Sequence, residues 1–300
     1  LLFAIFTTVT IPYLFSRIFH FRINIFHRII FTIAVFYFFR GYFLHPSNDH
    51  VSFFFLALAI NQILKTSMNA KMPFILAGIY LAFAILCRSN YIISLPFIFI
   101  LVILKTIKNK TYTPFIKRSL LFFIPFLLAL GVNHYFTDYR ETLGPIETSP
   151  SGVLISQLSW SLQTQKIEWN TGDQYKGTLI FSDRRSKTIL ENEQITETFL
   201  TIPQYLNLVI KYPVDFSVKY FQHLFNGLDI TYPDIYVYNV YRSRILFSLI
   251  NYSLIFFAII AMRDSIRRWY TESKETLLSI LALSIPGLSS IPFQVEPRFF

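Results

Sequence analysis

The stretch AGIYLAFAILCRSNYIISLPFIFILVIL (residues 77–104) decides the fold predicted from this sequence, because two long apolar runs meet there at a single arginine. Of the 300 residues, 53% are hydrophobic and 15% are charged, an apolar excess too large for a water-exposed domain to bury. The sequence therefore predicts an all-α membrane protein, a polytopic bundle of about eight transmembrane helices. The apolar runs lie at about residues 1–16, 29–44, 51–64, 73–87, 91–104, 119–132, 245–262 and 276–293.

Lys and Arg residues indicate how such a bundle is oriented. Alternate connections carry 14 of the 27 basic residues, whereas the short turns on the opposite side, at 45–50 and around Arg88, carry only Arg88. Because positive charge favours the cytoplasmic side, we expect a multi-pass integral protein of a bacterial inner or plasma membrane. The basic, cytoplasmic connections are then 17–28, 65–72, 105–118 and 263–275.

The segment 133–244 differs from the rest, since it contains 12 of the 17 acidic residues. We expect transmembrane helices one to six in 1–132, a folded extracytoplasmic loop domain in 133–244, and helices seven and eight in 245–300. Within the loop, PQYLNLVIKYPVDFSVKYFQHLF (203–225) has helical apolar spacing interrupted by Pro213, which predicts two short amphipathic helices. They lie along a membrane surface or pack only on the rest of the loop.

Several functions are excluded by composition and motifs. The net charge of +10 comes from basic residues between apolar runs, where they set orientation, so no nucleic-acid partner is expected. The single Cys87 excludes a disulfide within the chain, and no Cys/His cluster has zinc-binding spacing. Walker, GxGxxG, HExxH and GxSxG motifs are absent, which argues against an ATP-driven pump or a soluble-type hydrolase.

Asp49 is the only carboxylate in the first 137 residues, and it lies in the turn HPSNDH (45–50). A carboxylate among so many apolar residues is costly unless it faces water, a cation or a polar cavity. With His45 and His50 beside it, Asp49 suits a divalent cation or a sugar hydroxyl. The same turn also suits a helix cap, and the two roles are compatible.

Arg88 lies between two apolar runs on the side opposite the basic connections, where orientation does not explain it. A planar guanidinium at that position can hold a phosphate bidentately, although contact with lipid headgroups is an alternative. The last segment, SSIPFQVEPRFF, brings Glu296 and Arg298 to the same side. They are candidates for substrate binding, or for an ion pair with no ligand.

In the order of these parts the chain resembles the integral-membrane glycosyltransferases of the GT-C superfamily, which includes protein O-mannosyltransferases and aminoarabinose transferases. The resemblance lies in four elements. They are an outer turn ending in Asp (HPSND), a Gly-containing span ending in a basic residue (AGIYLAFAILCRSNYIISLPF), a long extracytoplasmic segment with surface helices, and a late Glu-x-Arg-like element (VEPRFF).

The resemblance implies an inverting transfer of a sugar from a polyprenyl-phosphate donor to a glycan, lipid or protein acceptor on the extracytoplasmic face. Asp49 would then act near the acceptor or a metal, and Arg88 would contact the donor phosphate. Glu296 and Arg298 are carried over as further substrate contacts. No cofactor is certain, a divalent cation is a candidate, and membrane lipids are expected partners.

In such enzymes the general base is an Asp in the first outer loop. Because the sequence begins with Leu1 inside an apolar stretch, we expect an internal fragment whose general base lies upstream. Three alternatives remain open. They are an O-antigen-type polysaccharide polymerase or ligase, a lipid or polysaccharide transporter, and a purely structural membrane component.

Overall fold

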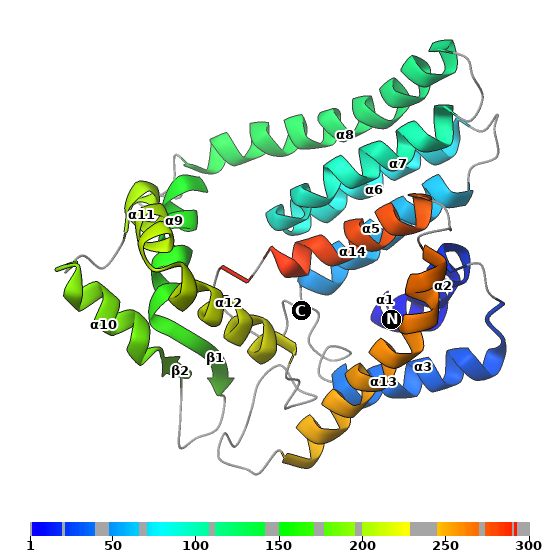
Figure 1. Ribbon diagram of the computed structural model, residues 1–300. Helices are drawn as coiled ribbons and strands as arrows, with labels where there is room; N and C mark the ends of the chain where they lie inside the picture. The colour runs from blue at the N-terminus through cyan, green and yellow to red at the C-terminus, as the bar shows by residue number, and fades with distance from the viewer. Residues whose placement is uncertain are drawn as a thin grey trace. The chain divides into compact units, whose positions relative to one another are not determined.

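The computed structural model describes residues 2–19, 22–39, 48–65, 71–107, 112–141, 150–170, 177–195, 200–228, 245–269, 274–289 and 291–292. These residues are mainly helical (Figure 1). The chain divides into two compact units. The first unit comprises Leu1–Leu143 and Phe256–Pro286, and the second comprises Gly144–Ile255 and Gly287–Phe300.

The first unit is built from helices, and most of them follow the apolar runs of the sequence. Two short elements depart from α-helical geometry, a π-helical segment at Phe6–Thr10 and a 3₁₀ segment at Ser89–Ser94. The α-helices are α1 (Leu2–Ile5), α2 (Ile11–Ile18), α3 (Ile25–Phe39), α5 (Asn48–Lys65), α6 (Met72–Cys87), α7 (Leu95–Ile107), α8 (Tyr112–Glu141) and α14 (Lys274–Leu288). Helix α13 (Ile245–Trp269) crosses the boundary between the units.

Helix α6 forms the centre of the first unit, since it packs against both α5 and α8 (Figure 1). Its buried positions include the small residues Ala77, Gly78 and Ala82, which allow neighbouring helices to approach closely. Large apolar side chains from the surrounding helices fill the rest of the core without exposure to solvent. Among them are Leu56 and Ile60 from α5, Ile98 and Leu101 from α7 and Phe122 from α8.

The second unit combines helices with a two-stranded antiparallel sheet. Strand β1 (Thr164–Asn170) pairs with β2 (Gly177–Ser182), with Ile167 opposite Ile180 and an irregularity between Thr164 and Lys166. The helices are α9 (Pro150–Gln163), α10 (Arg184–Asn192), α11 (Ile202–Lys211) and α12 (Pro213–Leu228). A core of Leu162, Ile189, Leu200, Tyr205, Leu208 and Phe216 joins α9 to α10, α11 and α12.

Local sequence explains where the helices of the second unit begin. Thr201 and Gln204 form a reciprocal capping box at the start of α11, which satisfies two otherwise unpaired backbone N–H groups. Pro213 is the first residue of α12, a position where its missing N–H costs nothing. Two helices therefore occupy the stretch around Pro213.

The transmembrane architecture predicted above is wrong. Within the described parts of the chain, no helix combines the length with the apolar character that crossing a bilayer requires. Helices α7 and α6 have 13 and 16 residues, against the roughly 20 that a hydrocarbon core demands. Helix α5 reaches 18 residues only by including Asn48, Asp49 and Lys65 at its ends.

This finding also corrects the placement as a multi-pass protein of a bacterial inner or plasma membrane. The assignment of residues 133–244 to a folded extracytoplasmic loop domain stays a prediction.

The contact between α6 and α8 gives the first prediction. A Cβ atom added at Gly78 would overlap the backbone oxygen of Phe122, which cannot move without displacing α8. We expect Gly78→Ala to lower the free energy of unfolding by about 1–3 kcal/mol because of this overpacking. Thermal or denaturant unfolding of the full chain measures it.

Gly131→Ala is the matched control, because a Cβ at Gly131 on α8 meets no atom within 4 Å. Alanine is the better helix former by about 1 kcal/mol, so this variant should be as stable as the parent or slightly more stable. Equal effects of the two substitutions would show that α6 and α8 do not approach at Gly78.

Candidate functional site

The first candidate site is an ion pair between the start of α5 and the end of α6. Asp49 is the second residue of α5, and Arg88 follows the last residue of α6 in an extended backbone conformation. The Arg88 guanidinium contacts the Asp49 carboxylate, and their side chains retain 27% and 13% of their solvent exposure. The positive end of the helix dipole also favours a carboxylate in the first turn, so both Arg88 and α5 itself stabilise the charge of Asp49.

Several hydrogen bonds fix the position of this pair. The Tyr91 hydroxyl donates to the backbone oxygen of Asp49 at 3.3 Å, which joins the 3₁₀ segment to α5. From the same segment, the Ser94 hydroxyl donates to the Ala282 oxygen at 2.7 Å and the Asn90 amide donates to the Pro286 oxygen at 3.3 Å. The backbone that carries Arg88 is therefore anchored to both α5 and α14.

Burial also sets the protonation of two neighbouring side chains. It lowers the pKa of His50 from 6.5 to about 4, so the imidazole is neutral at pH 7. Burial, together with the negative charge of Asp49, raises the pKa of Tyr91 well above its usual value. Both side chains are thus neutral at pH 7.

The structure brings together part of the predicted site. Asp49 and Arg88 meet, and His50 follows Asp49 in the first turn of α5. His45, Glu296 and Arg298 lie outside the described residues.

A divalent cation remains a prediction. In the segments that the structure describes, no three His, Cys, Asp or Glu side chains gather into a metal-binding group.

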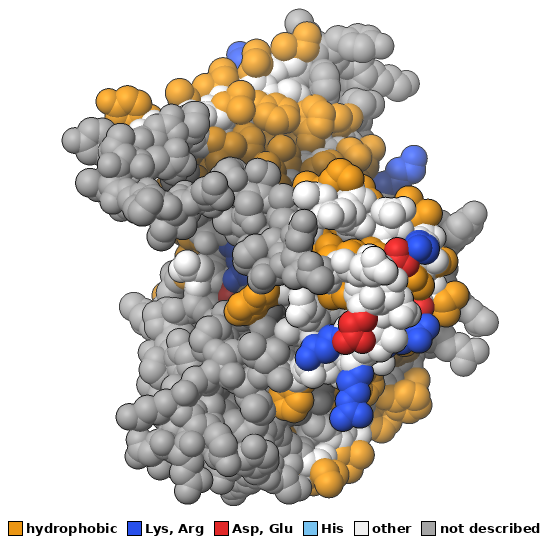
Figure 2. Space-filling view, turned by 90° about the vertical axis from the view of Figure 1, so that its left-hand side faces the viewer, with side chains coloured by type: hydrophobic (Ala, Val, Ile, Leu, Met, Phe, Trp, Pro, Cys, Tyr) orange, Lys and Arg blue, Asp and Glu red, His pale blue; other side chains and the backbone are white. Residues whose placement is uncertain are grey.

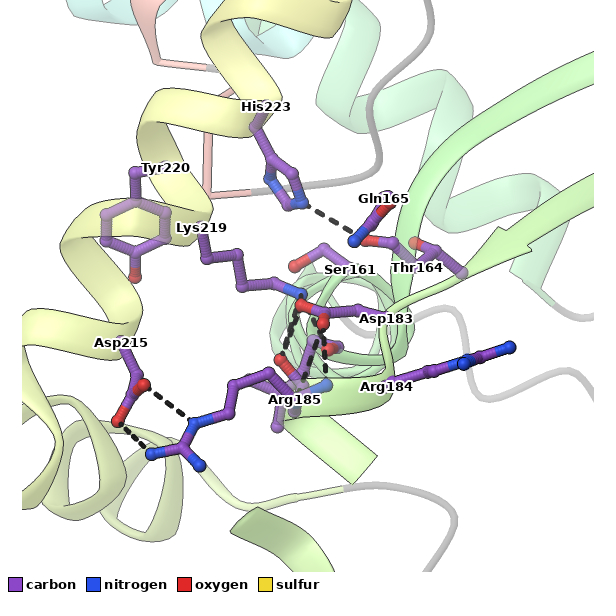
Figure 3. Close-up of polar contacts among 12 residues, drawn as sticks. Ser161, Thr164, Gln165, Asp183, Arg184, Arg185, Asp215, Lys219, Tyr220 and His223 are labelled. Atoms are coloured by element: carbon purple, nitrogen blue, oxygen red, sulfur yellow. Dashed lines mark hydrogen bonds and ion pairs between the residues drawn. The ribbon is translucent and has the colours of Figure 1, made fainter. Parts of the chain in front are cut away.

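A second polar cluster, which the sequence analysis missed, lies inside the second unit (Figure 3). Lys219 of α12 is 4% exposed, and its ammonium donates to the Leu162 oxygen at 2.6 Å, to Asp183 Oδ2 at 2.9 Å and to the Ser186 hydroxyl at 3.2 Å. Asp183 also caps α10 by accepting from the backbone N–H of Arg185 and Ser186. One carboxylate therefore both starts α10 and binds α12.

Charge balance keeps this cluster ionised. Burial acts to raise the pKa of Asp183, but the hydrogen bond and positive charge of Lys219 outweigh it, so the pKa lies below its ordinary value. Burial lowers the pKa of Lys219, and Asp183 opposes that shift. All three N–H groups of the ammonium point at oxygen acceptors, an arrangement that fits the charged form.

A pocket of about 440 Å³ adjoins this cluster and is lined by residues that include Asp183, Arg184, Arg185, Asp215 and Lys219. At its rim, Arg185 donates to both carboxylate oxygens of Asp215, at 2.8 and 3.3 Å. Because every donor of Lys219 is already used inside the protein, the ammonium stabilises the unit and is not available to a ligand. Charged side chains of both signs lie next to one another on the face shown in Figure 2.

His223, one turn after Lys219, is fully buried. Its Nδ1 lies 2.8 Å from the Ile291 oxygen and its Nε2 lies 3.1 Å from the Thr164 oxygen. Burial is the largest influence on its pKa and lowers it. The ring thus lies between β1 and the segment at Ile291, and in its neutral form its single N–H hydrogen-bonds one of the two oxygens at a time.

Helices α11 and α12 bury one face and expose a second apolar row. Tyr205, Leu208 and Phe216 lie in the core of the unit. The exposed row consists of Leu206, Ile210, Val214, Val218, Phe221 and Phe225, each more than half exposed. These helices therefore pack on the rest of the unit and still leave apolar surface uncovered.

Comparison with known proteins gives no relative. No family model, no curated protein and no solved structure matches the chain.

A signal for the missed cluster is present in the sequence. Phe216, Lys219 and His223 have the spacing of one helix face, and Phe216 marks that face as buried. Asp183 before Arg-Arg-Ser is a helix-start pattern.

The Asp183–Lys219 pair gives a stability prediction. Lys219→Met leaves a buried carboxylate without its partner, which we expect to cost about 3–5 kcal/mol of unfolding free energy. Adding Asp183→Asn to it should recover part of the loss, because no unpaired charge remains. Denaturant unfolding of the parent protein, the single variant and the double variant measures these free energies.

Arg185→Met is the matched control, since it breaks an ion pair that solvent screens. Its effect should be far smaller than that of Lys219→Met, and a similar effect would contradict the structural role of the buried pair.

His50 gives a prediction of pH dependence. Its pKa is about 4 in the folded chain against 6.5 when exposed, so unfolding takes up a proton between these values. The stability that neutral His50 contributes is complete above pH 6.5 and is lost as the pH falls toward 4. Urea unfolding at several pH values should show this loss, and His50→Gln should reduce it. A His50 titration near pH 6.5 by NMR would contradict the burial.

Proposed function

We propose that the protein transfers a sugar from a polyprenyl-phosphate donor to a hydroxyl group on a glycan, lipid or protein acceptor. Arg88 contacts the donor phosphate and Asp49 serves the acceptor side. The observation that carries this proposal is the partly exposed ion pair between Asp49 and Arg88, held in place by hydrogen bonds to α5 and α14.

The chemistry of the donor suits this pair. A polyprenyl phosphate gains negative charge as the bond to the sugar breaks, and a positioned guanidinium stabilises that charge. A guanidinium has five N–H donors in a fixed fork, so one Arg can hold a carboxylate and a phosphate oxygen at once. Asp49 can accept a hydrogen bond from the acceptor hydroxyl and so orient it for attack on the anomeric carbon. The polyprenyl phosphate then leaves, and the hydroxyl proton passes to water.

The surroundings of the pair strengthen this role. Tyr91, whose hydroxyl is hydrogen-bonded to the Asp49 oxygen, is 7% exposed. Charges that are partly removed from solvent are less screened than those on an open surface. Arg88 therefore acts on a bound anion more strongly than an exposed arginine would.

Variants of the two charged residues test this proposal. The full-length protein is incubated with a polyprenyl-phosphate hexose that carries a radiolabelled sugar, and label transferred to cell-envelope acceptors is measured. Arg88→Ala should slow transfer about 100-fold, the usual cost of losing one transition-state donor. Arg88→Lys should retain part of the activity, since a point charge remains. Asp49→Asn should raise the KM for the acceptor.

Arg185→Ala is the control for general effects of removing an arginine, because Arg185 belongs to the exposed pair of the second unit. Thermal unfolding of each variant separates loss of activity from loss of folding. Unchanged transfer in both Arg88→Ala and Asp49→Asn, or no transfer by the parent protein from any polyprenyl-phosphate hexose, would overturn the proposal.

A further inference from the structure

A separate pocket lies in the first unit where α2, α5 and α7 end and α14 begins. Its volume is about 410 Å³, and its wall consists of Ser16, Arg17, Ile18, Leu64, Lys65, Lys105, Glu275 and Thr276. It is distinct from the Asp49–Arg88 pair. Asp49 and Lys65 lie at opposite ends of α5, about 24 Å apart at the helical rise per residue.

The pocket has more positive than negative charge. Three side chains in the wall are cations, Arg17, Lys65 and Lys105, and Glu275 is its single carboxylate. Lys105 and Glu275 form an ion pair at 2.6 Å, with side chains 20% and 12% exposed. Three positive charges less one negative charge leave the wall with a formal charge of +2.

The wall is held in place by contacts within the unit. The Thr276 hydroxyl is buried and donates to the Ile18 oxygen at 3.0 Å, which joins the start of α14 to the end of α2. Arg17 is ordered on its own helix, because its guanidinium lies 4.4 Å from the centre of the Tyr13 ring and donates to the Tyr13 hydroxyl. Ordered cations lose less side-chain entropy when they bind a ligand.

Cations near helix C-termini often have a simpler role. Arg17, Lys65 and Lys105 each lie in the last turn of their helix, where positive charge is favoured. That preference acts on each helix alone and does not explain why the three share one pocket. Here they also lie against the N-terminal turn of α14, whose backbone N–H groups add positive potential.

We propose that this pocket binds a phosphate group, either as a free phosphate compound or as the headgroup of an anionic lipid. The dianionic charge of a phosphomonoester matches the +2 of the wall, and inorganic pyrophosphate is a more highly charged anion of the same class. Lys65 and Arg17 provide the principal contacts, while Lys105 remains paired with Glu275 and adds to the positive potential. Glu275 opposes binding by its charge.

Calorimetric titration of the full-length protein with inorganic pyrophosphate tests the free-ligand source. Co-sedimentation with phosphatidic acid vesicles, compared with phosphatidylcholine vesicles, tests the lipid source. Lys65→Ala and Arg17→Ala should each weaken binding about tenfold, the loss of one charge-assisted contact. Glu275→Gln should tighten binding several-fold by removing the opposing charge, a change that a purely structural role for these residues would not produce.

Lys274→Ala is the matched control. Lys274 is the exposed neighbour of Glu275 and is not part of the wall, so its loss should change the affinity by less than about twofold. Binding of pyrophosphate identifies a free phosphate ligand, and binding of phosphatidic acid vesicles alone identifies a lipid headgroup. The proposal is overturned if neither probe binds, if Lys274→Ala weakens binding as much as Lys65→Ala, or if Glu275→Gln weakens it.

Discussion

The close packing of α6 against α5 and α8 is the constraint on which the first unit depends. Gly78 allows the backbones of α6 and α8 to meet, and α6 in turn fixes the end at which Arg88 emerges. Because α5 also packs against α6, Asp49 at the start of α5 reaches the guanidinium. The pocket at Lys65 lies at the opposite end of α5, so one helix positions charged residues at two separate places.

In the second unit, the buried charge of Lys219 holds together elements that are distant in the chain, whereas close helix packing does so in the first unit. Lys219 bonds to the Leu162 oxygen, 57 positions away in the chain, and to Asp183, 36 positions away. Hydrogen bonds to all of its donors offset the cost of removing the ammonium from water. The same kind of group thus has different roles in the two units, because Arg88 remains partly exposed whereas Lys219 does not.

The sequence predicts local structure better than membrane behaviour or long-range pairing. Apolar runs at 51–64 and 73–87 correspond to α5 and α6, and Pro213 marks the start of α12. The bundle was mispredicted because an apolar run alone does not ensure a helix that is both long enough and apolar enough to cross a bilayer, and among the described helices none is. Asp49 and Arg88 were expected on one side of the bundle, and they meet. The burial of Lys219 depends on partners distant in the chain, which periodicity along α12 does not identify.

The two carbonyl oxygens beside His223 have a consequence for the motion of the second unit. A neutral imidazole has one N–H. With the proton on Nδ1 the ring donates to the Ile291 oxygen, and with the proton on Nε2 it donates to the Thr164 oxygen. In each tautomer the nitrogen without a proton faces the other oxygen, and their lone pairs repel. A change of tautomer therefore turns the attractive contact into a repulsive one and the repulsive contact into an attractive one. Only one of the two contacts, to β1 or to the segment near Ile291, is a hydrogen bond at a time, so strengthening one contact weakens the other.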